Sequence, residues 1–161
     1  MNTKSKLIYY EESLAMTKRD IVEKHLEILR GLQTESGLFL ASKASVSTGY
    51  DKAWLRDNFY ETLAFEEVGE WEPVHKAFRA VLDILIKHEA KIELAARDKP
   101  AETWQYIHAR YNPETFDEYW EEWGNKQNDA IGAILFKLGS LDMEYTADDK
   151  RVIQRLVDYL A

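Results

Sequence analysis

The sequence contains no cysteine and only three prolines and seven glycines among its 161 residues. Without cysteine, the chain can form neither a disulfide bond nor a thiolate metal site. The low proline and glycine content argues against long disordered or low-complexity segments. No apolar run approaches membrane-spanning length, and residues 1–16 are too short and too polar for a signal peptide. We therefore expect a cytoplasmic protein with no membrane partner.

Several catalytic signatures are also missing. None of the four histidines lies at metal-ligand spacing from another, so no metal site is expected. The chain has no phosphate-binding glycine loop and no Gly-x-Ser-x-Gly elbow, which leaves nucleotide chemistry and serine-nucleophile hydrolysis without support. The formal net charge of −8 repels phosphate backbones. We expect no cofactor and no nucleic-acid partner.

The composition that remains is that of an ordinary globular protein, with 45% hydrophobic and 31% charged residues. Its length corresponds to about one domain, which we assign to residues 1–161. Five tryptophans and nine tyrosines are many for this length. They indicate either a large core or a ligand-binding surface, and composition does not separate the two.

Apolar residues recur at three- and four-residue steps in several segments, which predicts an all-α fold with about five helices. The predicted helices span about residues 21–32, 58–68, 74–92, 131–138 and 146–160. Pro73 is well placed near the start of the third, and Gly139 can end the fourth. Thr146 and Asp149 form a plausible capping box for the last.

Two segments between these helices read as loops. Residues 34–49 are rich in Ser, Thr and Gly. Residues 97–127 are longer and carry many aromatic and acidic side chains, and such a loop inside a compact domain is usually functional or mobile. The last helix reaches Ala161 without a cap. We expect either that the chain is the front part of a longer protein or that a partner covers its exposed apolar face, with self-association as one outcome.

Two segments carry the residue types that hold a sugar. The first contains Tyr50, Trp54, Arg56 and Asp57, and the second is EYWEEWGNKQNDA at 118–130. A sugar presents apolar C–H faces, which pack on aromatic rings. Its hydroxyl rim pairs with planar groups such as those of Arg, Asp, Asn and Gln. Both segments precede a predicted helix, so their loops can line one cavity if the helices are neighbours.

A purely structural interpretation of the first segment is also available. Asp57 can cap a helix that begins at Asn58, with Arg56 as a surface salt-bridge partner. Trp54 can belong to the core, since tryptophan is highly buried on average. The acids at 117–122 can simply form a solvated face. The order and spacing of the two segments together favour the ligand-binding interpretation.

The pattern Tyr-x-x-x-Trp-x-Arg-Asp at 50–57, followed by Trp-Gly-x-x-Gln-x-Asp at 123–129, resembles glycoside hydrolase family 15. That family includes glucoamylases and the glucoamylase-like domains of phosphorylase kinase α and β subunits. The stretch ARYNPETFDEYWEEWGNKQNDAIGAIL looks closer to the phosphorylase-kinase-like and bacterial branch. The resemblance runs from about residue 13 to the chain end and implies part of an (α/α)₆ toroid, with the active site at one end of the barrel.

The resemblance also implies roles for individual residues. Arg56 and Asp57 match a pair that binds hydroxyls of the terminal glucose, while Gln127 and Asp129 match polar supports beside it. The aromatic positions that match pocket residues of the family are Tyr50, Trp54 and Trp123. Ala130 departs from the glycine that is common in fungal members. The implied partner is an α-glucan or a glucose-type oligosaccharide.

Family members invert the anomeric centre with two glutamates, whose carboxyls lie roughly 6.5–9.5 Å apart. The family's acid sits in a Trp-Glu-Glu motif after a helix like 146–160, and this chain ends just before that point. A Trp-Glu-Glu does occur at 120–122, but upstream of Trp-Gly-x-x-Gln, so neither Glu121 nor Glu122 is assigned as the acid. No catalytic residue is assigned.

Three functions are therefore considered. The favoured one is the N-terminal portion of a glucoamylase-like hydrolase that carries part of the glucose subsite and is inactive alone. The alternative is a non-catalytic carbohydrate-sensing or regulatory module, as the phosphorylase kinase subunits suggest. The third is a plain helical interaction domain in which the motifs are coincidental.

Overall fold

The computed structural model describes residues 17–43, 50–121 and 124–161. These ranges contain six α-helices, one 3-10 helix and two short strands, so the predicted all-α fold is confirmed. The elements are α2 (Lys18–Arg30), β1 (Ala53–Trp54), α3 (Leu55–Val68), α4 (Trp71–Lys87), α5 (Glu89–Asp98), η1 (Thr103–Gln105), β2 (Arg110–Tyr111), α6 (Asn128–Ser140) and α7 (Ala147–Leu160). None of the described helices is both long enough and apolar enough to cross a membrane.

The chain divides into two compact units, Met1–Gly31 and Leu32–Ala161. In the first unit, α2 begins with a capping box. Thr17 Oγ1 accepts from the backbone N–H of Asp20, and the Asp20 carboxylate accepts from the N–H of Thr17. The helix ends at Arg30 with Gly31 as its C-cap residue, close to the predicted end.

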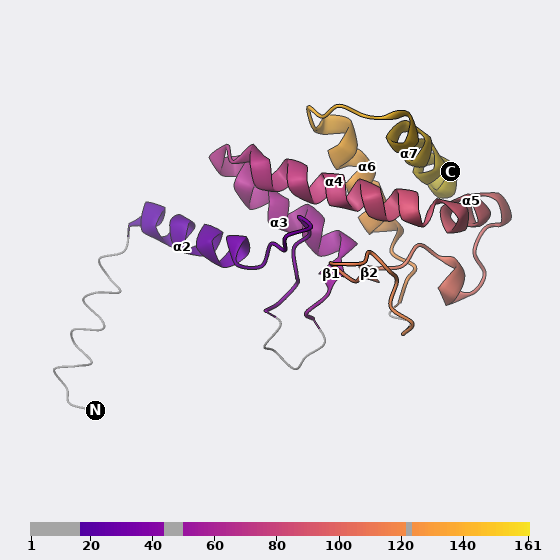
Figure 1. Ribbon diagram of the computed structural model, residues 1–161, viewed down its shortest axis with the longest axis horizontal. Coiled ribbons are helices and arrows are strands. Elements are labelled where there is room, and N and C mark those ends of the chain that lie inside the picture. The colour runs from indigo at the N-terminus through magenta and orange to yellow at the C-terminus, as the bar shows by residue number, and fades with distance from the viewer. Residues whose placement is uncertain (1–16, 44–49, 122–123) are drawn as a thin grey trace. The chain divides into compact units, whose positions relative to one another are not determined.

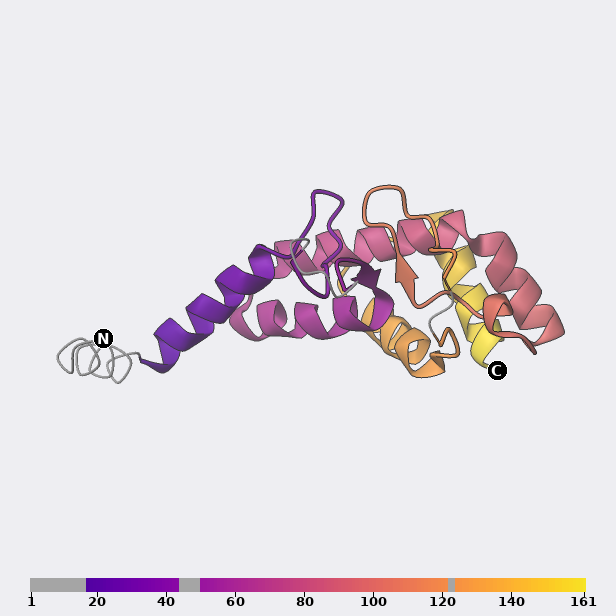
Figure 2. The ribbon, with the colours of Figure 1, turned by 90° about the horizontal axis from the view of Figure 1, so that it is seen from below.

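The second unit is built around four helices that enclose an apolar core. α4 packs against both α3 and α7, α3 packs against α6, and α6 packs against α7. Figures 1 and 2 show α4 running along this unit, with α5 continuing its path beside α7. The core side chains come from all four helices and include Phe65, Phe78, Leu82, Leu85, Ile134, Val152 and Leu156.

α3 begins three residues earlier than predicted, at Leu55 rather than Asn58. The reason is a long-range pairing in which β1 and β2 form a two-stranded antiparallel sheet, with Trp54 opposite Arg110. The Leu55 N–H donates to the carbonyl of Ala109 at 3.0 Å, which supplies a partner at the start of the helix. Three- and four-residue spacing in this segment predicts an apolar face with Tyr60, Leu63 and Val68, but these side chains are 61%, 39% and 42% exposed.

The helix predicted at 74–92 is two helices, α4 and α5, which meet at His88. No proline or glycine marks this break. The His88 ring instead hydrogen-bonds to the carbonyl of Phe116 at 2.8 Å, a contact that 28 residues separate along the chain. α4 begins at Trp71, so Pro73 lies in its first turn, as predicted.

The two C-terminal helices follow the sequence signals with one exception. Gly139 does not end α6, which continues to Ser140 and is followed by Leu141 in an extended conformation. The capping box of α7 is confirmed, since Thr146 and Asp149 exchange side-chain to backbone hydrogen bonds.

The described part of the 34–49 segment, residues 34–43, packs closely against α4. Gly37 has φ +104°, and a Cβ atom there would come within 2.5 Å of the Lys76 carbonyl oxygen, so only glycine fits. The side chain of Gln33 fixes the same turn by donating to the carbonyls of Gly37 and Pro73, each at 2.9 Å. The rest of that segment, 44–49, lies outside the described residues.

Candidate functional site

The start of α3 is held from two sides, and this positions the first predicted segment. The β1–β2 pairing fixes Trp54 from one side. From the other, the buried Asn58 amide accepts from Phe39 N–H at 2.8 Å and donates to the carbonyls of Phe39 and Trp54 at 3.1 and 2.8 Å. These bonds satisfy a buried polar side chain and anchor the helix start. The side chains of Trp54, Arg56 and Asp57 therefore project from a rigid base.

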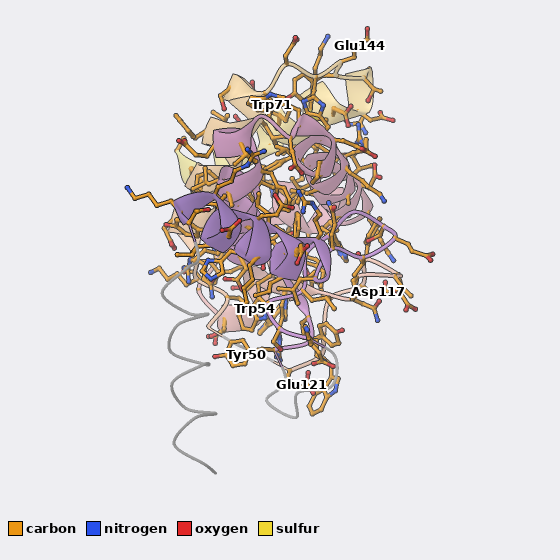
Figure 3. The ribbon with its side chains drawn as sticks, turned by 90° about the vertical axis from the view of Figure 1, so that its left-hand side faces the viewer. Tyr50, Trp54, Trp71, Asp117, Glu121 and Glu144 are labelled. Carbon is orange, nitrogen blue, oxygen red and sulfur yellow. The ribbon has the colours of Figure 1, made fainter. Side chains whose placement is uncertain are left out.

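Trp54 is mostly buried, with 7% of its surface exposed. Its ring stacks on Tyr50, with centroids 5.8 Å apart and planes 21° apart. The Arg110 guanidinium lies 5.6 Å from the Trp54 ring centre and the same distance from the ring of Tyr119. Figure 3 shows Tyr50, Trp54 and Glu121 toward one side of the molecule and Trp71 and Glu144 toward the other. Tyr50, 45% exposed, is the aromatic that the segment presents to solvent.

Arg56 joins the two predicted segments. Its Nε and Nη2 donate to the two carboxylate oxygens of Asp129, each at 2.9 Å. This is the bidentate geometry that gives Arg–carboxylate pairs their strength and direction. Arg56 stands in the first turn of α3 and Asp129 in the first turn of α6. The expected convergence of the two segments is therefore present in the structure.

This ion pair remains accessible. The side chains of Arg56 and Asp129 are 39% and 68% exposed. The hydrogen bonds from Arg56 lower the pKa of Asp129 below its usual value. The pair is therefore a charged, solvent-facing clamp whose unused donors and lone pairs can bind hydroxyl groups.

Asp57 does not cap α3, which corrects the structural interpretation given above. Trp54 occupies the cap position, and no side chain there bonds to the helix backbone. Asp57 lies in the first turn and is partly buried. Burial raises its pKa, and the charge of Arg56 opposes that rise. Its carboxylate is free of the capping role and available to a ligand.

Glu61 follows Asp57 by one helical turn and was not singled out from the sequence. Burial, reinforced by the negative charge of Asp57, raises its pKa to about 8. Its Oε2 atom is buried and has no hydrogen-bond partner among the described residues. The i,i+4 spacing from Asp57 was the available signal, because residues four apart share one helix face. A neutral Glu61 at pH 7 can donate a hydrogen bond as well as accept one.

The remaining predicted residues lie around the start of α6. Gln127 occupies the position before this helix and donates from Nε2 to the Gly124 carbonyl at 3.2 Å. Trp123 and Glu122 lie outside the described residues. The Glu121 carboxylate accepts from Arg110 at 3.3 Å.

No group of three or more acidic or histidine side chains in the described ranges could hold a metal ion. The chemistry that these residues offer is hydrogen bonding by the exposed Arg56–Asp129 pair, with Asp57 and Glu61 on the same helix as Arg56. Tyr50 adds an exposed aromatic ring, stacked on Trp54 just before that helix. That combination suits a neutral ligand with many hydroxyls.

A sequence model of the family described as Glycosyl hydrolases family 15 matches residues 19–161. Solved structures of glycosidases share the fold. A glycosidase variant in complex with glucose is 20% identical, with a TM-score of 0.72 over 88% of this chain and 39% of that chain. Another glycosidase variant is 18% identical, with a TM-score of 0.72 over 91% of this chain and 42% of that one.

This chain therefore spans about two fifths of the length of the glycosidases it matches. The structural likeness agrees with the predicted partial helical toroid. Among curated protein sequences, none matches this chain.

Proposed function

The chain belongs to glycosyl hydrolase family 15, and from that membership we propose that it is the N-terminal portion of a glucoamylase-like hydrolase. In this proposal it carries part of the glucose-binding subsite for inverting hydrolysis of α-glucosidic bonds. The ligand is an α-glucan or a glucose-type oligosaccharide. The glucose complex of a similar glycosidase supports a ligand of this class.

The Arg56–Asp129 clamp is the observation that carries the proposal. It joins two sequence motifs 73 residues apart at the first turns of adjacent helices. A sugar hydroxyl can accept from the Arg56 guanidinium and donate to Asp57 or Asp129, with each partner using the geometry that planar groups favour. In this assignment Tyr50 and Trp54 form the aromatic wall, Gln127 supports the clamp, and Trp123 packs on the substrate.

The proposed chemistry divides between recognition and bond cleavage. Inversion requires one carboxylic acid that protonates the leaving oxygen and one carboxylate that activates water, roughly 6.5–9.5 Å apart. We assign neither role to a residue of this chain. The 161 residues alone are expected to bind the sugar without hydrolysing it.

Binding can be followed at Trp54 by ¹⁹F NMR of the full chain labelled with 5-fluorotryptophan, with signals assigned through Trp→Phe variants. Maltose is expected to shift the Trp54 signal in a saturable manner. Arg56→Ala is expected to abolish that shift, because it removes the clamp. Arg151→Ala provides the matched control. Arg151 also makes a bidentate pair, with Glu89 at 2.7 and 2.8 Å, but between α7 and α5.

Two outcomes would contradict the proposal. The binding assignment is wrong if the Trp54 signal stays unchanged in the wild type, or if it shifts equally in Arg56→Ala. Release of glucose from maltose by the purified chain, measured in a coupled glucose assay, would show that it does contain a catalytic pair.

A further inference from the structure

A cavity lies apart from the Arg56–Asp129 clamp, and none of the described residues assigned to the glucose subsite lines it. We call it the α5 cavity. It is bordered by α5, by the turn that follows it with η1, and by residues 118–120 with Asn125. Its volume of about 400 Å³ lies within the range of sites for small ligands, roughly 300–1,000 Å³. We propose that the α5 cavity is a second carbohydrate-binding site, which takes a neutral pyranose unit.

Exposed aromatic and apolar side chains form the walls of the α5 cavity. Trp104 is 59% exposed and Trp120 is 88% exposed, and both line it together with Leu94 and Tyr119. Tryptophan is highly buried on average, so two exposed tryptophans at one cavity need a reason. The C–H face of a pyranose ring is flat and apolar, and it covers an indole ring while leaving the hydroxyls at the rim.

The charges around the α5 cavity balance, which favours a neutral ligand. Lys91 Nζ pairs with both carboxylate oxygens of Glu118, at 2.9 and 2.8 Å. The other two charged side chains of the lining, Asp98 and Lys99, have opposite signs, so the formal net charge of the lining is zero. Burial lowers the pKa of His108, which keeps its ring neutral near pH 7. A lining with no net charge favours a neutral ligand over a phosphate or a carboxylate.

One buried amide in the lining, that of Asn125, has an acceptor oxygen without a hydrogen-bond donor in the described part of the chain. Asn125 is 2% exposed, and its Nδ2 donates weakly to the Thr103 carbonyl at 3.5 Å. Its Oδ1 atom is buried and forms no hydrogen bond within the described residues. An unsatisfied buried acceptor costs about 1–3 kcal/mol. A ligand that carries hydroxyl donors can satisfy this atom, whereas an apolar ligand cannot.

A neighbouring amide is already fixed in place. The Oε1 atom of Gln105 accepts from the backbone N–H groups of Ala101 and Glu102 at 2.9 and 2.8 Å. Its NH₂ group forms no hydrogen bond to any other described residue, so it remains available as a donor. The cavity thus combines aromatic surface, balanced charge, one buried acceptor and one oriented donor, which is the recognition chemistry of a sugar.

The test uses the full chain labelled with 5-fluorotryptophan, with maltotriose as the probe. The signals of Trp104 and Trp120 are expected to shift together and to saturate. Trp104→Ala is expected to weaken the binding seen at Trp120 about tenfold or more, which corresponds to about 1.4 kcal/mol. Because Trp104 is largely exposed, its replacement should not disturb folding. The Trp71 signal, from a residue outside the cavity lining, serves as the internal control.

Two further arms make the test specific. Sorbitol carries the same kind of hydroxyls without a ring face, and it is expected to leave both signals unchanged. Arg56→Ala is expected to leave the Trp104 and Trp120 shifts intact, so that failure of the glucose subsite and failure of the α5 cavity are distinguishable. The proposal is overturned if maltotriose gives no saturable shift at Trp104 or Trp120. It is equally overturned if the Trp120 shift survives unchanged in Trp104→Ala, or if Trp71 shifts in parallel.

Discussion

Asp57 and Glu61 show how one turn of helix changes the chemistry of a carboxyl group. Both lie on the same side of α3, and burial raises the pKa of each. Arg56 limits the rise at Asp57, whereas the Asp57 charge adds to the rise at Glu61. The site therefore places Glu61, which keeps its proton near pH 7, one helical turn from Asp57, whose rise in pKa Arg56 opposes. This pairing comes from local spacing within a single helix.

Replacing Glu61 by glutamine tests this pair through the pH dependence of stability. The folded-state pKa of about 8 exceeds the ordinary value of 4.5, so the folded protein binds the proton more tightly than the unfolded chain. The stability that this tighter proton binding contributes to the folded protein is fully present below about pH 4.5 and is lost as the pH rises through about 8. Glu61→Gln should remove this decline and make the variant more stable than wild type above pH 8.

Urea denaturation between pH 5 and 9 measures the effect. Glu67→Gln is the control, because Glu67 is exposed on the same helix and its replacement should leave the pH profile of the wild type intact. If wild type and Glu61→Gln lose stability in parallel between pH 5 and 8, the raised pKa does not exist.

At the scale of elements, ion pairs between helices position the bundle. The clearest is between α4 and α7, where Arg79 donates to both oxygens of Asp149 at 2.9 and 2.6 Å. Asp149 is fully buried and is also the acidic member of the α7 capping box. The hydrogen bonds from Arg79 hold the pKa of Asp149 well below its usual range. One carboxylate thus starts a helix and docks it on its neighbour.

Asp149→Ala is expected to destabilise the protein by roughly 2–4 kcal/mol. The variant loses both a charged hydrogen-bonding partner and a helix cap, and it leaves Arg79 without its buried acceptor. The measurement is the free energy of unfolding from urea titration. Asp148→Ala is the matched control. It lies in the same turn, with its side chain 59% exposed, and pairs with Arg151, so it should cost less than about 1 kcal/mol. Equal losses for the two variants would contradict the role assigned to Asp149.

The elements also show what the sequence could predict and what it could not. Apolar periodicity predicted the helices, and local signals such as Thr146 with Asp149 predicted the start of α7, because these depend on neighbours in the chain. The start of α3 depends on the pairing of Trp54 with Arg110, and the break at His88 accompanies a contact with Phe116. Neither contact leaves a local pattern.

The same distinction applies to the candidate site. The motifs predicted that the two segments would lie together, and the hydrogen bond from Arg56 to Asp129 joins them. The part played by Arg110, which lies against Trp54 and Tyr119 and binds Glu121, was missed because no spacing rule connects these positions. The roles assigned to the site residues remain predictions for the binding experiments.

At the scale of the whole molecule, large apolar side chains remain exposed on two helices that pack together. On α3, Tyr60 and Leu63 are 61% and 39% exposed, and on α6 Phe136 is 69% exposed. A helix of a globular protein normally turns its apolar stripe toward a core. These helices therefore have apolar surface beyond what the bundle covers, and such surface favours association.

We expect the isolated chain to self-associate through this surface. Sedimentation velocity should show an average mass that rises with protein concentration above that of the 18.8 kDa monomer. Phe136→Lys should shift the population toward monomer, since it places a charge where apolar contact is required. Trp104→Lys is the control, because Trp104 is an aromatic of similar exposure that lies at the α5 cavity. A wild-type chain that stays monomeric at the highest concentration tested would refute the expectation. An equal effect of the two lysine variants would place the contact elsewhere.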